Sequence, residues 1–231
     1  MTKAPRAGQV KTRLTPPLTP EEAAALNICF LKDIANSIST AAGKGVARGI
    51  AVYTPVGAES AYDSVLPDDF ALIPQRGDKF GERLIFALKD LLSVGFASVC
   101  LINSDSPTVP AQTFAKAVEL LSQPGERAVL GPSDDGGYYL IGLKTLHRRL
   151  FEEIDWSTER VLEQTLDRAR EIKLEVQMLP NCFDVDDKTT LQRLSNELLG
   201  SDAESSVAPE TRRYLSQLLD HGGRERIIPA Q

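Results

Sequence analysis

A regular alternation of apolar, strand-like runs with longer helical patterns is the feature of this sequence that most constrains its fold. Six β-rich runs predict strands at residues 49–54, 70–74, 98–103, 128–131, 138–143 and 174–179. Helical patterns fill most of the gaps, at residues 20–38, 57–66, 80–94, 110–121, 157–171 and 188–199. N-caps are expected at Thr19, Ser157 and Asp187. This alternation predicts a mostly parallel sheet with helices on both faces.

The segment at residues 131–143 departs from this alternation. Two strand-like runs are joined there by residues 133–137, which are too few for a crossover helix. A short antiparallel element is therefore expected. Because open parallel sheets bind ligands beyond the carboxyl ends of their strands, we expect the functional site among the polar residues that follow the strands.

The length and the charge of the chain limit its function. Its 231 residues suit one domain, predicted at residues 1–199, followed by a C-terminal extension at 200–231 in which small and charged residues replace apolar runs. With 26 basic and 32 acidic side chains, the net charge of -6 argues against nucleic acid as a partner. An anionic ligand would need a local cluster of positive charge or a bound cation.

The cysteines and the hydropathy pattern predict a cytoplasmic protein. Cys29, Cys100 and Cys182 lie far apart and form no C-x-x-C pair, so neither a zinc site nor a disulfide framework is indicated. No apolar run approaches the roughly 18 residues of a membrane span, and the first residues lack the apolar core of a signal peptide. We expect no membrane span, and the sequence leaves a homo-oligomer open.

The loop at residues 3–14 carries four cations and a glycine before the first helix. Gly8 would let the backbone approach a phosphate closely, and Lys3 adds positive charge. Lys11 and Arg13 could place charges on phosphate oxygens and are therefore candidate catalytic residues as well. The spacing is not that of a Walker motif. The alternative interpretation is a solvated basic tail.

Acidic residues follow two of the predicted strands. Asp105 comes after the strand at 98–103, and Asp184 and Asp186 follow the last strand. Carboxylate oxygens are preferred ligands of Mg²⁺ and Mn²⁺, so Asp105 is the first candidate ligand. Asp184 and Asp186 face the same side of an extended chain, and both could reach the same ion. The alternative is that these acids, with the helix cap Asp187, serve only in turns.

Two glycine-containing segments are candidates for contacts with the rest of the substrate. Gly136 and Gly137 form a tight turn beside Asp135, which could hydrogen-bond a ligand or act as a general base. The alternative is an ordinary hairpin turn. After the second predicted strand, Gln75 could pair with a nucleobase and Gly77 could admit a ribose, although such loops also occur for geometric reasons.

These motifs occur together in an order that resembles a known family. They are Lys3-x-Pro5-x-x-Gly8-x-Val10-Lys11-Thr12-Arg13-Leu14, Ser104-Asp105-Ser106-Pro107, Asp135-Gly136-Gly137-Tyr138-Tyr139-Leu140-Ile141-Gly142 and Asp184-Val185-Asp186. The order resembles a largely uncharacterised bacterial family of glycosyltransferase-A-fold proteins that are labelled glycosyltransferases or nucleotide-diphospho-sugar transferases. It is more distantly similar to molybdenum-cofactor and phospholactate guanylyltransferases. The resemblance covers about residues 1–199.

The resemblance implies an α/β fold, a Rossmann-like three-layer sandwich of the glycosyltransferase-A type. It further implies phosphates held by the N-terminal loop and Mg²⁺ or Mn²⁺ shared by Asp105 and Asp186. The implied function is a transferase, acting on a nucleotide or nucleotide sugar and an unidentified small acceptor. Two alternatives are a nucleotidyltransferase that joins a nucleoside triphosphate to a phosphorylated acceptor and releases pyrophosphate, and a non-catalytic nucleotide-binding protein. Relatives have an apolar strand before the basic loop, whereas this chain reaches the loop almost at once. We therefore expect either that the sheet lacks its first strand or that the true start lies further upstream.

Overall fold

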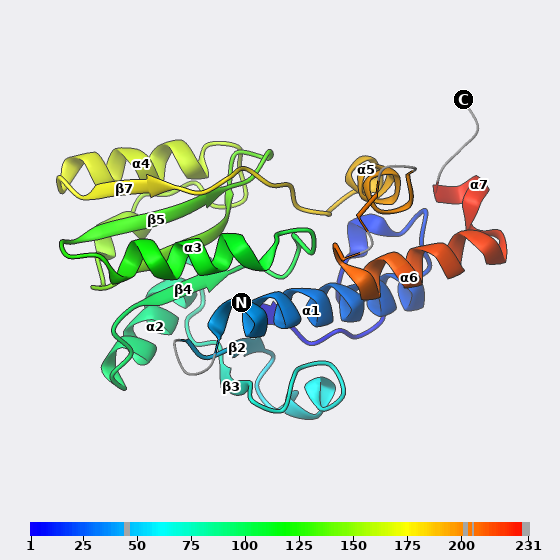
Figure 1. The fold of residues 1–231 in the computed structure, drawn as a ribbon, viewed down its shortest axis with the longest axis horizontal. Coiled ribbons are helices and arrows are strands. Elements are labelled where there is room, and N and C mark those ends of the chain that lie inside the picture. The colour runs from blue at the N-terminus through cyan, green and yellow to red at the C-terminus, as the bar shows by residue number, and fades with distance from the viewer. Residues whose placement is uncertain (44–46, 201–202, 205, 228–231) are drawn as a thin grey trace.

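Two sheets form the centre of the protein, for which a computed structural model describes residues 1–43, 47–200, 203–204 and 206–227 (Figure 1). The first sheet is parallel, with the order β1-β2-β3, and consists of β1 (Thr2–Lys3), β2 (Ile50–Thr54) and β3 (Ala71–Pro74). The second has the order β4-β6-β5-β7 and consists of β4 (Val99–Ile102), β5 (Arg127–Pro132), β6 (Tyr138–Leu143) and β7 (Glu175–Met178).

Strand β6 runs antiparallel to both of its neighbours, β4 and β5, whereas β5 and β7 are parallel. The predicted antiparallel element is therefore confirmed. Ile102 at the end of β4 pairs with Leu140 near the start of β6. This register brings the β5–β6 turn beside the carboxyl end of β4.

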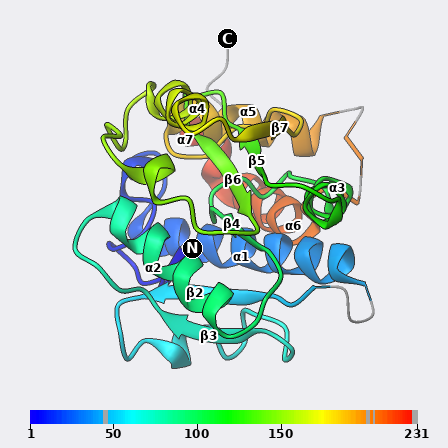
Figure 2. The same ribbon diagram turned by 90° about the vertical axis from the view of Figure 1, so that its left-hand side faces the viewer.

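Helices cover the strands on both sides (Figure 2). The helices are α1 (Pro20–Ala42), α2 (Phe80–Ser93), α3 (Ala111–Ser122), α4 (Val161–Glu171), α5 (Lys188–Leu199), α6 (Pro209–Leu218) and α7 (Arg224–Ile227). Leu130 and Ile141 pack with residues of α2 and α4, whereas Val129 and Leu140 pack with residues of α3, as the alternation of side chains along a strand requires. None of the described helices is long and apolar enough to cross a membrane. The predicted three-layer α/β class is confirmed.

Two of the three predicted helix caps are confirmed. The hydroxyl of Thr19 accepts the backbone N–H of Glu22, and the carboxylate of Asp187 accepts that of Thr190. The cap at Ser157 is wrong, because Ser157 has a positive φ of 67° and α4 begins four residues later, after Arg160. The helix predicted at 57–66 is wrong as well, since only a 3-10 turn forms there, at Glu59–Tyr62.

The expected absence of a first strand is also wrong, although β1 has only two residues. It pairs with Tyr53 and Thr54 of β2, and the nitrogen of Met1 donates a hydrogen bond of 2.7 Å to the carbonyl of Ile102. The two sheets are thus joined at β1. Beside it lies an apolar cavity of about 250 Å³, lined by parts of α1, β2 and β4.

The C-terminal extension packs against α1. The buried carboxylate of Asp33 accepts the backbone N–H groups of Glu210, at 3.0 Å, and Thr211, at 2.8 Å, at the start of α6. Phe30 of α1 and Leu215 of α6 belong to the same buried cluster. Helix α6 therefore completes the core over α1.

We expect Asp33→Ala to lower the free energy of unfolding by about 2 kcal/mol, because two N–H groups of α6 would lose their acceptor. Urea unfolding followed by circular dichroism measures this change. The matched control is Asn36→Ala on the exposed side of the same helix, which is expected to change the stability by less than about 0.5 kcal/mol. Equal stabilities of the two variants would contradict the role of Asp33.

Candidate functional site

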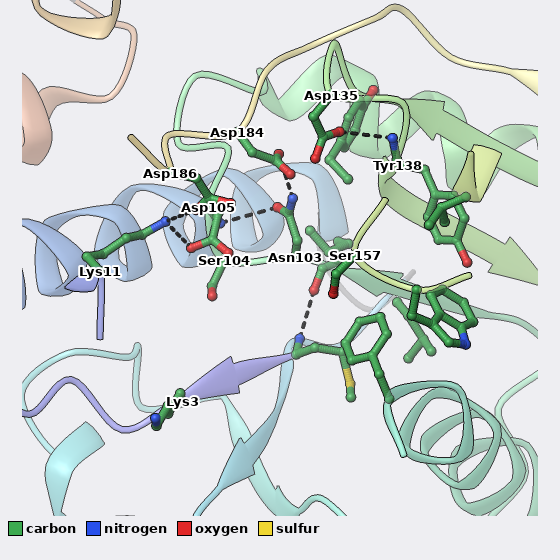
Figure 3. Close-up of a pocket in the computed structure, with 18 of the residues that line it drawn as sticks. Lys3, Lys11, Asn103, Ser104, Asp105, Asp135, Tyr138, Ser157, Asp184 and Asp186 are labelled. Atoms are coloured by element: carbon green, nitrogen blue, oxygen red, sulfur yellow. Dashed lines mark hydrogen bonds and ion pairs between the residues drawn. The ribbon is translucent and has the colours of Figure 1, made fainter. Parts of the chain in front are cut away.

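A cavity of about 720 Å³, lined by both polar and apolar side chains, lies beyond the carboxyl end of β4 (Figure 3). This volume is in the range of sites for cofactors and small molecules. Five segments contribute to its lining: the N-terminal loop, residues 103–105 after β4, the β5–β6 turn, the segment 184–186 and the loop 156–159 before α4. The cavity therefore lies where ligands bind in open α/β sheets.

The carboxylates of Asp105 and Asp186 converge on the ammonium group of Lys11 (Figure 3). Lys11 Nζ forms a close ion pair with Asp105, lies 3.1 Å from Asp186 Oδ1 and donates to the carbonyl of Val185 at 2.8 Å. Only 4% of the Lys11 side chain is exposed. Burial tends to lower the pKa of Lys11, but the two carboxylates outweigh that effect and raise it. The side chain is therefore a charged internal cation.

Asp184 lies beside this ion pair and is held by different groups. Its carboxylate accepts hydrogen bonds from Asn103 Nδ2, at 2.8 Å, and from the hydroxyl of Ser106. Burial raises the pKa of Asp184 to about 6 against these hydrogen bonds, and the charges of Asp105 and Asp135 add to the increase. Asp184 and Asp186 both line the cavity while Val185 between them is fully buried, which confirms the expected alternation.

The β5–β6 turn supplies another carboxylate and positions a neighbouring loop. Asp135 Oδ1 accepts the backbone N–H of Gly137 at 2.9 Å. Gly136 has a φ of 83°, and a Cβ there would overlap the backbone carbonyl of Glu159. Its own carbonyl accepts the N–H of Leu162 at 2.8 Å. Gly136 therefore fixes the loop before α4 instead of facing the cavity.

An aromatic corner, formed by Phe80 and Trp156, lies in another part of the cavity lining. The two ring centroids are 5.1 Å apart, and the ring planes meet at 74°. The indole packs directly on Gly81, where a Cβ would approach Trp156 Nε1 to 2.8 Å. Figure 3 shows Ser157, next to Trp156 in the chain, on the side of the acidic residues opposite Lys11. The loop that carries Trp156 thus lies away from the internal cation.

Seven of the predicted site residues line the cavity, namely Lys3, Lys11, Arg13, Asp105, Asp135, Gly137 and Asp186. Four others do not belong to its lining: Gly8, Gln75, Gly77 and Gly136. The amide of Gln75 donates to the backbone carbonyls of Thr2, at 3.1 Å, and Val52, at 3.0 Å. These bonds stabilise β1 and β2, so the side chain predicted to pair with a nucleobase is directed at the sheet.

Several residues of the site were not predicted from the sequence. Asn103 and Ser106 flank Asp105 in the chain, and their position after a strand is the signal that could have included them. Trp156 is the single tryptophan and directly precedes the helix predicted at residues 157–171, a position that suggests packing against that helix. Its place in the cavity depends on contacts with Gly81 and with Phe80, which no local pattern contains.

The chain belongs to the family DUF2064, described as uncharacterized protein conserved in bacteria, whose model matches residues 37–158. The matched range includes Asp105, Asp135 and Trp156, and it lies between Lys11 and Asp186. Comparison with curated proteins gives no significant match.

The fold is shared with several solved structures, of which two are compared with this chain. One is a protein from Desulfovibrio desulfuricans G20, provisionally described as a nucleotide-diphospho-sugar transferase; it is 28% identical with a TM-score of 0.84, and the match covers 97% of this chain and 94% of that chain. The other is CMP:2-keto-3-deoxy-manno-octonic acid synthetase complexed with CTP, at 11% identity and a TM-score of 0.50, covering 71% of this chain and 85% of that chain. The second likeness concerns the fold alone. Both support the fold class, and the Desulfovibrio protein also supports the family resemblance predicted from the motifs.

We expect Gly136→Ala to destabilise the protein by about 3 kcal/mol, because the added Cβ both strains the backbone and overlaps Glu159. The matched control is Gly95→Ala. Gly95 also has a positive φ, of 102°, but a Cβ there has open space around it. The control is expected to cost only about 1–2 kcal/mol. Thermal and urea unfolding compare the two variants. An equal loss of stability would show that the contact with Glu159 does not contribute to stability.

Proposed function

We propose that this DUF2064 protein is a metal-dependent transferase that uses a nucleotide-sugar donor. The observation that carries the proposal is the convergence of Asp105 and Asp186 on one cation position inside a cavity that the basic N-terminal loop also lines. The likeness to the Desulfovibrio protein, over nearly the full length of both chains, supports a sugar nucleotide as the donor.

The donor atoms around the Lys11 ammonium suit Mg²⁺ or Mn²⁺. Two carboxylates with substrate phosphates form a usual ligand set for these ions, and Asp105 and Asp186 would supply the carboxylates. Among the described residues, no group of three or more acidic, histidine or cysteine side chains forms a metal site by itself. This suits an ion that is bound together with the phosphates of a nucleotide. When bound, it would neutralise the charge that develops on the leaving phosphates.

The protein's own residues have separate roles in this proposal. Lys11, released from Asp105 and Asp186 when a divalent cation binds them, would pair with phosphate oxygens together with Arg13. Asp135 keeps Oδ1 on the N–H of Gly137, and its second oxygen would take the proton of an attacking acceptor hydroxyl. Asn103 and Ser106 would hold Asp184 in place beside the ion.

Nucleotidyl transfer is the second candidate, because Lys11 and Arg13 both line the cavity and suit a triphosphate. Glycosyl transfer consumes a nucleotide sugar and releases a nucleoside diphosphate, whereas nucleotidyl transfer consumes a triphosphate and releases pyrophosphate. A product assay with pooled nucleotide sugars, pooled triphosphates and Mn²⁺ separates the two. Binding without either product would instead favour a non-catalytic nucleotide-binding protein.

We expect Asp105→Asn to abolish the metal-dependent binding of nucleotide, because an amide is a much poorer ligand of Mg²⁺ or Mn²⁺ than a carboxylate. Thermal shift with a panel of nucleotides, with and without Mn²⁺, measures the effect. Asp187→Asn is the matched control, since Asp187 lies in the neighbouring acidic segment but caps α5, a role that asparagine also fills. A wild-type protein without any metal-dependent shift would refute the proposal, and unchanged binding in Asp105→Asn would refute this ligand.

Lys11→Met is expected to raise the affinity for the metal ion and to lower the affinity for the nucleotide. Without the ammonium, the Mn²⁺ affinity of the nucleotide-free protein should rise about tenfold, or roughly 1.4 kcal/mol, because no internal cation competes for the carboxylates. Nucleotide affinity in the presence of Mn²⁺ should fall, because a phosphate partner is lost. Titration calorimetry measures both, and Lys116→Met on the surface is the control. An unchanged Mn²⁺ affinity would mean that the ammonium and the ion do not share a position.

A further inference from the structure

We propose that the aromatic corner of Phe80 and Trp156 binds the sugar ring of the donor, and that the cavity selects an uncharged ring at this position. This sugar subsite rests on the proposed function and adds the class of sugar that it accepts. Three observations support it: the distribution of charge along the cavity, the geometry of the corner and the acidic groups around it.

The cations of the cavity are confined to one part of the chain. Among the described lining residues, every lysine and arginine comes from residues 3–13, and Lys11 is already paired with Asp105 and Asp186. The polar side chains of Gln9, Thr12 and Asn27 line the cavity with them. Such groups can pair with the edge of a base and with phosphates. If the phosphates lie at Asp105, the nucleoside is best accommodated on the side of the N-terminal loop, and the sugar lies on the other side.

The geometry of the corner suits a sugar ring. Its two rings meet at 74°, so they form two walls instead of a pair of parallel plates. A flat base stacks on one face, whereas a puckered ring presents C–H groups in several directions and can contact both walls. Phe80 is 49% exposed, which leaves apolar surface available to a ligand. Because the indole is held against Gly81, the surface is formed before the ligand arrives.

Outside residues 3–13, every charged side chain in the described cavity lining is acidic. Asp135 and Glu159 are two of them, and the carboxylate of Asp135 is close enough to Asp184 to raise the pKa of that residue. In the described lining, neither the start of α2, the β5–β6 turn nor the loop before α4 contributes a lysine or arginine. Arg160 pairs with Asp155 at 2.9 Å and does not belong to the lining. A carboxylate or phosphate on the transferred group would meet like charge without a partner.

Trp156→Ala tests the subsite. Titration calorimetry with Mn²⁺ would compare UDP with UDP-glucose, or GDP with GDP-mannose if guanine is the base that binds. We expect the variant to bind the nucleoside diphosphate within about twofold of the wild type and the sugar nucleotide about tenfold more weakly, which is roughly the size of one lost aromatic contact. An equal loss for both ligands would overturn the proposal, since the corner would then contact the nucleoside.

Two further variants keep this test decisive. Phe80→Ala removes a half-exposed ring and is expected to keep the fold even if Trp156→Ala does not. It should show the same selective loss of sugar-nucleotide affinity. Trp156→Phe retains one aromatic wall and should restore most of that affinity. Failure of Trp156→Phe to bind the sugar nucleotide better than Trp156→Ala would argue against an aromatic contact.

The charge of the sugar is tested separately. The wild type is expected to bind UDP-glucose at least about tenfold more tightly than UDP-glucuronate, or GDP-mannose than GDP-mannuronate, because the acid meets Asp135 and Glu159. Ser157→Lys places a cation on the exposed loop that lines the corner, and it should reduce this preference severalfold. Equal binding of the neutral and acidic sugars by the wild type would overturn the selectivity. A wild type that binds no nucleotide at all would refute the proposed function itself.

Discussion

The arrangement of the site depends on the ion pairs that the buried ammonium group of Lys11 forms with Asp105 and Asp186. A buried ammonium needs compensating charge, and Asp105 and Asp186 supply it from segments that are 94 or more residues away in sequence. The same contact holds the N-terminal loop over the carboxyl end of β4. The backbone N–H of Val185 also donates to the carbonyl of Asp105, at 2.9 Å. Asp105 and Asp186 are thus fixed relative to each other before a ligand binds. The ammonium group of Lys11 occupies the cation position between them.

Strand β6 lies antiparallel between β4 and β5, and this arrangement determines where Asp135 and the loop that carries Trp156 lie in the site. Because β6 starts beside the end of β4, the β5–β6 turn reaches the acidic residues, and Asp135 comes to face Asp184. The conformation of Gly136 then allows the turn to pack on the backbone of Glu159. This contact fixes the loop that carries Trp156. The aromatic corner therefore depends on the hairpin, although neither of its two aromatic residues belongs to it.

Sequence reasoning predicted the features that depend on local pattern, and it failed where tertiary contacts decide. Strand alternation and the short connection at residues 133–137 were enough to predict the antiparallel element that contains β6 and to bring Asp105 and Asp186 to one edge of the sheet. The orientation of Gln75 could not be predicted, because its amide serves backbone carbonyls of two other strands. Ser157 resembled a helix cap in sequence, yet the loop packed on Gly136 gives it a positive φ. The ion pairs of Lys11 with Asp105 and Asp186 could not be predicted either, because the sequence pattern suggested phosphate as the partner of Lys11 and a metal ion as the partner of the two carboxylates.

The excess of carboxylates in the cavity connects the proposed metal with the proposed sugar specificity. Asp105, Asp184, Asp186 and Asp135 all line the cavity, and Lys11 forms ion pairs with two of them, Asp105 and Asp186. A nucleoside diphosphate that entered alone would add negative charge to these acids, so a divalent cation that binds with it removes the main electrostatic cost. The divalent cation offsets the negative charge only near the phosphates. An acidic group on a sugar in the proposed subsite would still meet the carboxylates of Asp135 and Glu159 in the cavity lining, and it would keep its repulsion. The same acidic residues can therefore require a metal for the nucleotide and exclude charge from the group that is transferred.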